Sequence, residues 1–281
     1  MSKAKLQAGV KPRSTVVSTI TSDYLRWSFH EASGANAAYT GIISGSAVSG
    51  NSALDGTVTN IWDQRGWVTP EAGVGNVNLQ AAGDNTDWED HLRLDTTSTT
   101  GLLVFGTILW SGTPDNNQRL FGYGSISSRG GWHLYTPIGA NANVKLGTYG
   151  VGGSGEVSAT TVIGTPTGAR QGVPNTFVGY IDGSTIYLAN NGDWASANTG
   201  DISSETLIGR LTNDGIGLLC QTDFNGTAKA NEVNGDIVAG NETQLHNLTI
   251  MRVNLTQTEL ALLATQLNDN PREWPWVLEN K

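Results

Sequence analysis

The carboxyl-terminal stretch of residues 245–278 constrains the fold most, because it contains the clearest helical pattern of the chain. Thr256 opens this helix and Glu259 follows three residues later, which is the spacing of a capping box. Apolar residues then recur with helical spacing on one face, at Leu260, Leu263, Ala264 and Leu267. The stretch therefore predicts a short helix that buries a single face.

A strand directly precedes this helix and is apolar on both faces. Leu248 and Ile250 alternate along it with Thr249, Met251 and Val253. Two covered faces are expected where a helix lies over a sheet. We therefore expect the last strand to complete a sheet that the helix covers.

The rest of the chain has the composition of many short strands joined by turns. The 281 residues include 36 glycines and 8 prolines, and Ser, Thr and Asn are frequent. Turn signals recur roughly every 8 to 12 residues, as in a sandwich or barrel. Residues 32–60 are expected to form a long loop with short strand pieces. The predicted strands are residues 24–29, 91–94, 102–110, 119–123, 131–135, 144–149, 206–210 and 215–224.

Residues 176–189 give the most definite local prediction, a β-hairpin. Asp182 and Gly183 fit the favoured two-residue turn in which both positions need a positive φ. With this turn, the side chains that lie opposite each other on the two strands match on both faces of the hairpin. Its register pairs Val178 with Tyr187 and Phe177 with Leu188.

Five segments follow one another in an informative order. They are LRWSFHEASG (25–34), QRLFGYGSISSRGGWHLY (118–135), FVGYIDGSTIYLANNG (177–192), TLIGR (206–210) and LHNLTIMRVNLTQTELALLATQL (245–267). In this order they resemble the strands and closing helix of a laminin-G-like, concanavalin A-like jelly-roll domain. The resemblance runs over residues 24–270. It implies an all-β, antiparallel jelly-roll β-sandwich with one short carboxyl-terminal helix and an extended amino-terminal arm.

We predict three parts along the chain: a basic arm (1–22), the jelly-roll domain (23–270) and a Pro/Trp tail (271–281). The ending NPREWPWVL (270–278), which includes the first part of this tail, resembles the Asn-Pro-Trp endings of such domains in tailed-phage proteins. The resemblance thus implies a virion component. It does not settle function by itself, because the same fold serves lectins, glycan hydrolases and adhesion modules.

The amino-terminal arm is basic although the chain is acidic. Its basic residues all precede the first acid, Asp23, whereas the whole chain carries a formal net charge of −9. An acidic body argues against nucleic-acid binding. The arm predicts docking on a capsid or other virion protein, including a neighbouring copy in a homo-oligomer; the alternative is a solvated terminus. The basic residues are Lys3, Lys5, Lys11 and Arg13.

Targeting features are missing from the sequence. Residues 1–22 have no apolar core of signal-peptide length, and no run approaches the roughly 20 apolar residues of a membrane span. The lone Cys220 excludes a disulfide within one chain. We therefore expect no membrane partner and a protein that joins a virion assembled in the host cytoplasm.

Glu89, Asp90 and Asp95 form the best carboxylate cluster for catalysis. Jelly-roll glucanases place their acids on one face of a strand, at glycosidase separation. In an extended strand Glu89 and Asp90 point to opposite faces, and Asp90 and Asp95 differ in parity. We therefore predict no catalytic residue and no enzyme, and a polysaccharide hydrolase is the least favoured alternative.

An acidic loop offers oxygen ligands for calcium, which takes six to eight of them. Its spacing matches no defined motif, and Asp and Asn are common in turns for other reasons. We predict no cofactor and keep calcium as the open alternative. The loop residues are Asp84, Asn85, Asp87 and Asp90, and the histidines without ligand spacing are His30, His91, His133 and His246.

The chain has nine tryptophans, many for its length. Some lie in Gly- and Asp-rich loops, where an indole can stack on a sugar or anchor an interface. These candidates for glycan binding are Trp62, Trp67, Trp88 and Trp194, together with Asp87 and Asp90. Trp274 and Trp276 in the tail either fold back on the sheet or insert into a neighbour, and are candidates for partner binding.

These features together predict a non-enzymatic virion structural protein. It would be a phage capsid decoration or a tail-associated protein whose lectin-like jelly roll binds host or environmental glycans. The alternatives are a carbohydrate-binding adhesion module and a polysaccharide-degrading glycoside hydrolase.

Overall fold

The computed structural model describes sixteen segments of the chain. They are residues 20–33, 36–55, 67–68, 78–80, 100–110, 119–125, 129–135, 143–151, 157–162, 174–182, 185–198, 215–218, 220–225, 228–233, 243–271 and 273–281. Predicted strands 91–94 and 206–210 lie outside them.

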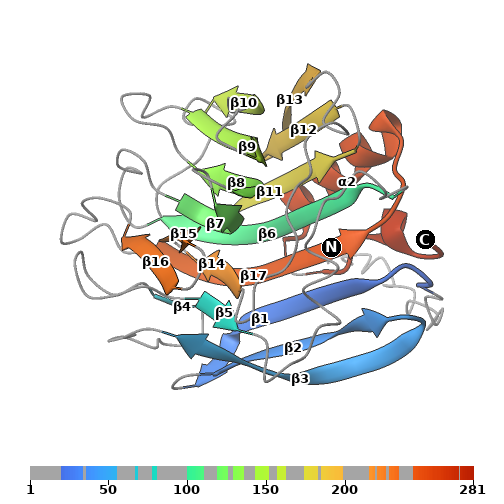
Figure 1. Ribbon diagram of the computed structural model, residues 1–281. Coiled ribbons are helices and arrows are strands. Elements are labelled where there is room, and N and C mark those ends of the chain that lie inside the picture. Colours follow the sequence, from blue (N-terminus) through green and yellow to red (C-terminus); the bar gives the residue numbers. More distant parts are fainter. Residues whose placement is uncertain are drawn as a thin grey trace, which may run out of the picture.

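The described elements are nearly all β-strands (Figure 1). In chain order they are β1 (Tyr24–Ser33), β2 (Asn36–Ile43), β3 (Ser46–Asp55), β4 (Trp67–Val68), β5 (Asn78–Gln80), β6 (Leu102–Trp110), β7 (Arg119–Ser125), β8 (Arg129–Tyr135), β9 (Asn143–Val151), β10 (Val157–Val162), β11 (Pro174–Ile181), β12 (Thr185–Asn190), β13 (Asp193–Asn198), β14 (Gly215–Leu218), β15 (Cys220–Asn225), β16 (Ala228–Val233) and β17 (Thr243–Arg252). The α-helix α2 (Gln257–Asp269) and the 3-10 helix η2 (Trp276–Leu278) follow. The remaining predicted strands are confirmed, with residues 215–224 divided between β14 and β15.

The strands form two packed layers. One hydrogen-bonded path runs β10-β9-β8-β7-β14-β5-β3-β2-β1-β17-β6-β11-β12-β13, and β4 pairs with β17 beside it. The path doubles back, so that β9 and β10 of one end pack against β12 and β13 of the other. The pairings between described strands are antiparallel. The predicted antiparallel β-sandwich with a short carboxyl-terminal helix is confirmed.

One face of each central strand points into the interior of the sandwich. On β1 this face carries Leu25, Trp27 and Phe29, all buried. The layers approach closely at Gly179 of β11, where an added Cβ would lie 2.8 Å from Leu146 Cδ2 on β9. Further buried side chains are Leu102, Val104, Ile108, Phe121, Trp132, Leu134, Val144, Phe177, Ile186, Leu188, Leu248 and Ile250.

A second apolar cluster lies on the opposite face of β6, β11 and β17, beneath α2. The helix contributes Leu260, Leu263, Ala264 and Leu267, the stripe that the sequence predicts. The sheet contributes Leu103, Phe105, Val178, Tyr180 and Met251. Both bonds of the predicted capping box are present. The helix therefore covers the outer face of the sheet, as expected, most closely over β11, and buries a single face.

The predicted loop over residues 32–60 is wrong. Most of it forms the long strands β2 and β3, paired from Asn36 opposite Ala53 to Ile43 opposite Ser46. Their turn places Ser44 and Gly45 at φ values of 50° and 74°. Because these strands are rich in small residues, their regularity comes from main-chain pairing, of β2 with β1 and of β3 with β2 and β5, rather than from an apolar pattern.

The register predicted for the β11–β12 hairpin is also wrong, because the turn is centred one residue later in the sequence than predicted. Tyr180 pairs with Tyr187 and Val178 with Ala189. The hairpin closes at Asp182, whose N–H donates to Thr185 O at 3.1 Å and whose Oδ1 accepts from Thr185 N at 2.8 Å. This side-chain bond favours a turn that joins Asp182 to Thr185 over the predicted turn, which would join residues 181 and 184. The shift moves each cross-strand partner by two positions, so each side chain keeps its face.

The turn between β12 and β13 gives a first prediction. Asn191 is buried at φ 50°; its Oδ1 accepts from Thr176 N at 2.9 Å and its Nδ2 donates to Asn175 Oδ1 at 2.8 Å. We expect Asn191→Ala to lower the free energy of unfolding by about 2 kcal/mol, because it leaves a buried N–H unsatisfied. Gly192→Ala, at φ 90° with open space around the added Cβ, is the control and should cost only about 1 kcal/mol. Equal losses in urea unfolding would contradict the role of the amide.

No helix in the described part of the chain is long and apolar enough to cross a membrane.

Candidate functional site

Most residues of the predicted glycan site lie outside the described residues. This holds for Trp62, Asp87, Trp88 and Asp90, for the other members of the two acidic clusters, and for Lys3, Lys5, Lys11 and Arg13 of the arm. Their roles, and the calcium alternative, stay predictions. Within the described segments, no three His, Cys, Asp or Glu side chains are grouped so that they could hold a metal ion.

Trp67 and Trp194 are separated by four strands. Trp67 on β4 pairs with Leu245 of β17, and Trp194 on β13 pairs with Ala189 of β12. Strands β12, β11, β6 and β17 lie between β13 and β4. At about 4.8 Å per strand, the two backbone positions are on the order of 20 Å apart. One sugar ring cannot contact both, so any role in glycan binding assigns them to different subsites.

The described part of the candidate site is the carboxyl-terminal cap, by which we mean α2, residues 273–281 and residues 20–24. Trp274 lies half-buried over the sheet. Its ring centroid is 4.9 Å from that of Tyr24 and 6.1 Å from that of Phe105. The guanidinium carbon of Arg26 lies 5.7 Å from the ring centroid. Of the two possibilities for this residue, the structure shows the fold-back onto the sheet.

The electrostatics under Trp274 follow from burial. Burial raises the pKa of the Tyr24 hydroxyl and lowers the pKa of the Arg26 guanidinium from its high ordinary value. Arginine stays protonated at neutral pH in proteins, so a cation faces the indole. A partly desolvated cation over an indole is attracted by the ring.

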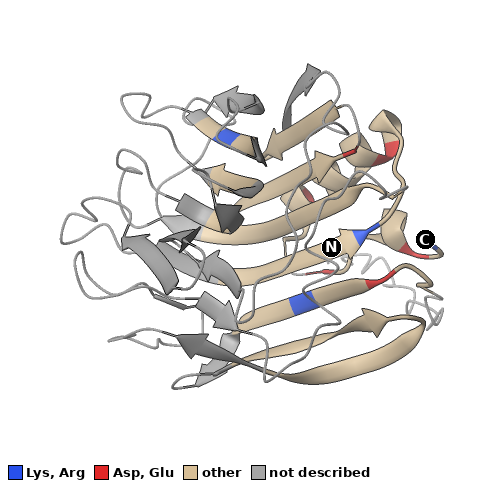
Figure 2. Cartoon of the chain, in the orientation of Figure 1, with Lys and Arg blue, Asp and Glu red and all other residues tan. Residues whose placement is uncertain are grey.

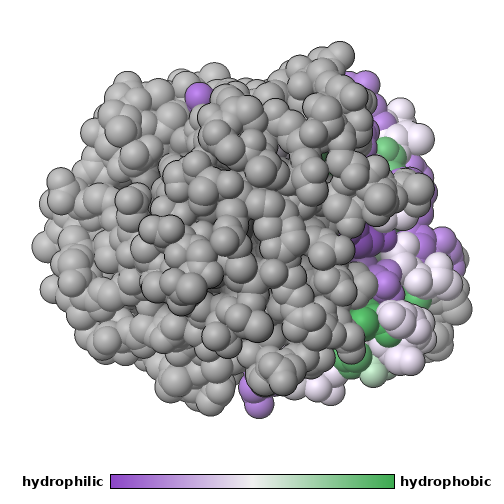
Figure 3. All heavy atoms as spheres, in the orientation of Figure 1, coloured by the Kyte–Doolittle hydropathy of each residue, from purple (hydrophilic) through white to green (hydrophobic). Residues whose placement is uncertain are grey.

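Trp276 differs from its neighbour in being exposed. It and Leu262 of α2 are the large apolar side chains that the described residues leave exposed, at 53% and 40%. The described rim of the molecule shows hydrophilic and hydrophobic residues side by side (Figure 3). Trp276 is thus available for a partner, and its predicted role stays a prediction.

The tail is packed on the domain by buried contacts. Val277 and Leu278 are buried in the cluster beneath α2, and the Val277 N–H donates to Gln266 Oε1 at 3.2 Å. At the start of the tail, Pro271 O accepts from Thr107 Oγ1 of β6 at 3.2 Å. The predicted division at residue 271 stays a prediction, although residues on both sides of it share this cluster.

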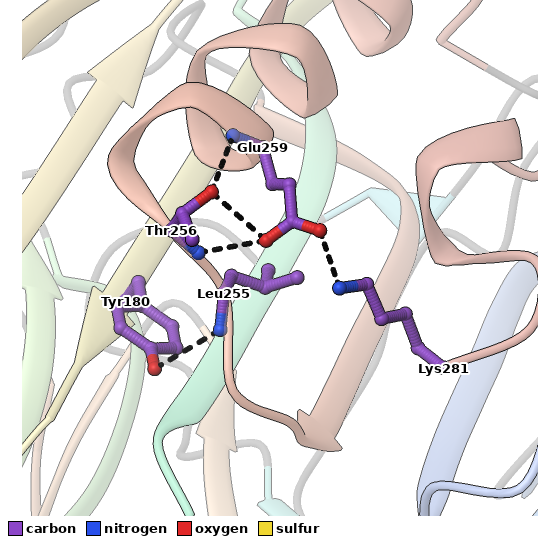
Figure 4. A network of polar contacts seen from close by, with 5 residues as sticks. All are labelled: Tyr180, Leu255, Thr256, Glu259 and Lys281. Atoms are coloured by element: carbon purple, nitrogen blue, oxygen red, sulfur yellow. Dashed lines mark hydrogen bonds and ion pairs between the residues drawn. The ribbon is translucent and has the colours of Figure 1, made fainter.

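A polar network joins the tail to the first turn of α2 (Figure 4). Glu259 accepts from the Thr256 N–H at 2.8 Å and from the Thr256 hydroxyl at 2.9 Å. Its other oxygen forms an ion pair with Lys281 Nζ. Nearby, the Leu255 N–H donates to the Tyr180 hydroxyl at 3.4 Å, which ties the loop before the helix to β11.

Lys281 also holds the base of the arm. Its main-chain oxygen accepts from Thr21 N at 2.7 Å, from Ser22 N at 2.9 Å and from Thr21 Oγ1 at 3.2 Å. Sequence reasoning missed this residue, because no local pattern relates positions 260 residues apart.

Around this cap, described acidic side chains outnumber the described basic ones, Arg26, Arg252 and Lys281 (Figure 2). Asp23 precedes β1, Asp182 follows β11, and α2 and the tail carry Glu259, Asp269, Glu273 and Glu279. The cap is therefore a surface to which a basic segment would be attracted.

The Glu259–Lys281 pair predicts a pH-dependent contribution to stability. The hydrogen bond from Lys281, followed by those from Thr256, holds the pKa of Glu259 below its ordinary value of 4.5. Because the folded-state pKa is depressed, the contribution is complete above the ordinary pKa and is lost as the pH falls through the folded-state value. We expect Glu259→Gln to lower the free energy of unfolding by less than about 1 kcal/mol at pH 7, because the pair is partly exposed. Thermal unfolding should show a smaller difference at pH 3; an unchanged difference would contradict this assignment.

Comparison with known proteins identifies the fold. No family model matches this sequence, and no curated protein does. The structure is similar to the binding domain of botulinum neurotoxin serotype C1, with a TM-score of 0.51 and 9% identity over 90% of this chain and 52% of that chain. It is also similar to the serotype D/C VPI 5993 binding domain, with a TM-score of 0.53 and 9% identity over 88% of this chain and 52% of that chain.

A third similar structure is the binding domain of botulinum neurotoxin DC in complex with SialylT. Its TM-score is 0.50, with 8% identity over 88% of this chain and 51% of that chain. The likeness is one of fold. This chain spans about half the length of the solved structures that it matches. Their shared β-sandwich agrees with the lectin-like fold expected from the motif order.

Proposed function

We propose that this protein is a non-enzymatic binding domain whose ligands are surface glycans. The observation that carries the proposal is the likeness of the β-sandwich to neurotoxin binding domains over about nine tenths of the chain. One such domain was solved in complex with SialylT. At such low identity the likeness concerns fold, so the ligand class is the proposed step.

The tryptophans of β4 and β13 define where binding is to be tested. An indole ring stacks on the apolar face of a sugar, and Trp67 and Trp194 lie too far apart to share one ring. We therefore assign them to two subsites and keep Trp62, Trp88, Asp87 and Asp90, which are nearer in sequence to Trp67 than to Trp194, as further candidates.

A glycan array with the purified full chain tests the proposal. We expect at least one class of oligosaccharide to bind, and Trp67→Ala or Trp194→Ala to weaken binding roughly tenfold or more, as expected for an aromatic anchor. Leu262→Ala is the control, because it removes an exposed apolar side chain on the cap. An array without hits would contradict the ligand class. Hits that neither Trp variant affects would contradict the subsites.

We further propose that the binding domain is carried on a virion, as a capsid decoration or a tail-associated protein. Support comes from the cap, where the base of the arm and the end of the tail meet at Lys281. A domain held at one such point can present its other end outward. The basic arm would contact capsid or other virion proteins, and copies would associate as a homo-oligomer.

Co-sedimentation tests this second proposal. We expect the full chain to sediment with phage particles and to be an oligomer in solution. Neutralising Lys3, Lys5, Lys11 and Arg13 together should release it, while Lys145→Met on β9 should not. A protein that stays monomeric and never sediments with a particle would contradict the virion role without affecting the glycan proposal.

A further inference from the structure

One residue joins two segments of the cap that are far apart in sequence. Through its side chain Lys281 contacts Glu259 in the first turn of α2, and through its main-chain oxygen it accepts from Thr21 and Ser22. Figure 4 shows the side-chain half of this arrangement, with Lys281 reaching the carboxylate from the tail. The base of the arm and the start of the helix are thus connected through a single residue.

The contacts of Lys281 lie where a change at the base of the arm can affect helix α2. Ile20 packs against the apolar cluster beneath α2, so the arm enters the fold beside the helix. Lys281 follows a residue in left-handed conformation, Asn280 at φ 68°, and its own N–H donates to Leu278 O at a long 3.4 Å. Beyond the buried Leu278, the Glu279 N–H donates to Trp276 O at 3.0 Å, and Lys281 adds its own bonds to Glu259, Thr21 and Ser22.

We propose that Lys281 is a latch that couples the base of the amino-terminal arm to helix α2. When the ion pair with Glu259 opens, Lys281 gains freedom and the amides of Thr21 and Ser22 lose their acceptor more often. The reverse also holds, because coupling between two sites is reciprocal: pulling residues 21 and 22 away from Lys281 weakens its hold on the helix. A partner that engages the arm, which rests on the proposed function, would thereby loosen residues 279–281 and the first turn of α2.

Hydrogen exchange of the isolated full chain tests the latch without any partner. Lys281→Met keeps the main-chain oxygen and the length of the side chain but removes the charge. We expect it to speed exchange roughly two- to five-fold at the amides of Thr21 and Ser22, the range for losing a partly exposed ion pair. Glu259→Gln should do the same, because glutamine at this position still completes the capping box. Lys145→Met removes an equal charge on β9 and should change neither amide.

A substitution in the arm tests the coupling in the reverse direction, from the arm to α2. Thr21→Pro removes both donors of Thr21 to Lys281, the N–H and the hydroxyl, and should speed exchange in the first turn of α2, at Glu259 and Leu260, more than 230 positions away in sequence. If Lys281→Met and Glu259→Gln leave Thr21 and Ser22 unchanged, the two segments are not coupled and the latch is excluded. Because no glycan or particle enters this experiment, its failure is distinct from failure of the proposed function.

Discussion

Leu263→Ala is expected to lower the free energy of unfolding by about 3 kcal/mol, the middle of the range for a fully buried leucine. Leu263 is 0% exposed and lies between α2 and the outer face of the sheet. The substitution leaves a cavity in the cluster formed with Phe105, Tyr180 and Met251. Thermal unfolding should show a Tm lower by roughly 5–10 °C, given the size of the chain.

The matched control is the neighbouring residue. Leu262 is 40% exposed on the same helix, so Leu262→Ala loses little burial and should change stability by no more than about 0.5 kcal/mol. Similar losses in the two variants would mean that α2 does not pack on the sheet through the predicted stripe.

Trp274→Ala is expected to cost about 2–3 kcal/mol, somewhat less than a fully buried tryptophan because the side chain is half-buried. The loss removes ring contacts with Tyr24 and Phe105 and uncovers Arg26. Trp274→Phe should recover most of it, since the indole Nε1 is buried without an acceptor in the described part of the chain. Urea unfolding of both variants measures the difference.

Trp276→Ala supplies the contrast within the same tail. At 53% exposure its indole contributes little to packing, and we expect a change in stability below about 0.5 kcal/mol. If Trp276 contacts a partner, the same variant weakens partner binding while the fold is unchanged. A large loss of stability for Trp276→Ala, or none for Trp274→Ala, would reverse the roles assigned to the two residues.

The features predictable from sequence are those with local causes. The structure shows the capping box of Thr256 and Glu259 and the four-residue apolar stripe. Both patterns lie within a dozen positions of the sequence. The hairpin was predictable in its faces but not in its turn, because the bond from Thr185 N to Asp182 Oδ1 competes with the favoured two-residue turn. Local turn preference is a weaker constraint than a specific side-chain bond.

The features that were missed depend on distant contacts. Strands β2 and β3 lack an apolar alternation. Only a glycine can occupy position 41 without a shift of the main chain, because an added Cβ would lie 2.0 Å from the main-chain oxygen of Tyr24 on β1. Such a close approach of two main chains leaves no periodic signature. In the candidate site, the sequence left the fold-back of Trp274 as one of two alternatives, but its contact with Tyr24 and the contacts of Lys281 relate positions far apart in sequence, which no local pattern can do.

Calorimetric titration of the full chain with the best oligosaccharide from the array, followed by analysis of the recovered sugar, tests the central claim most directly. The account predicts saturable binding and a sugar recovered intact, because the domain binds without catalysis. Absence of binding to every oligosaccharide tested would contradict the glycan ligand, and recovery of cleaved sugar would contradict the non-enzymatic role.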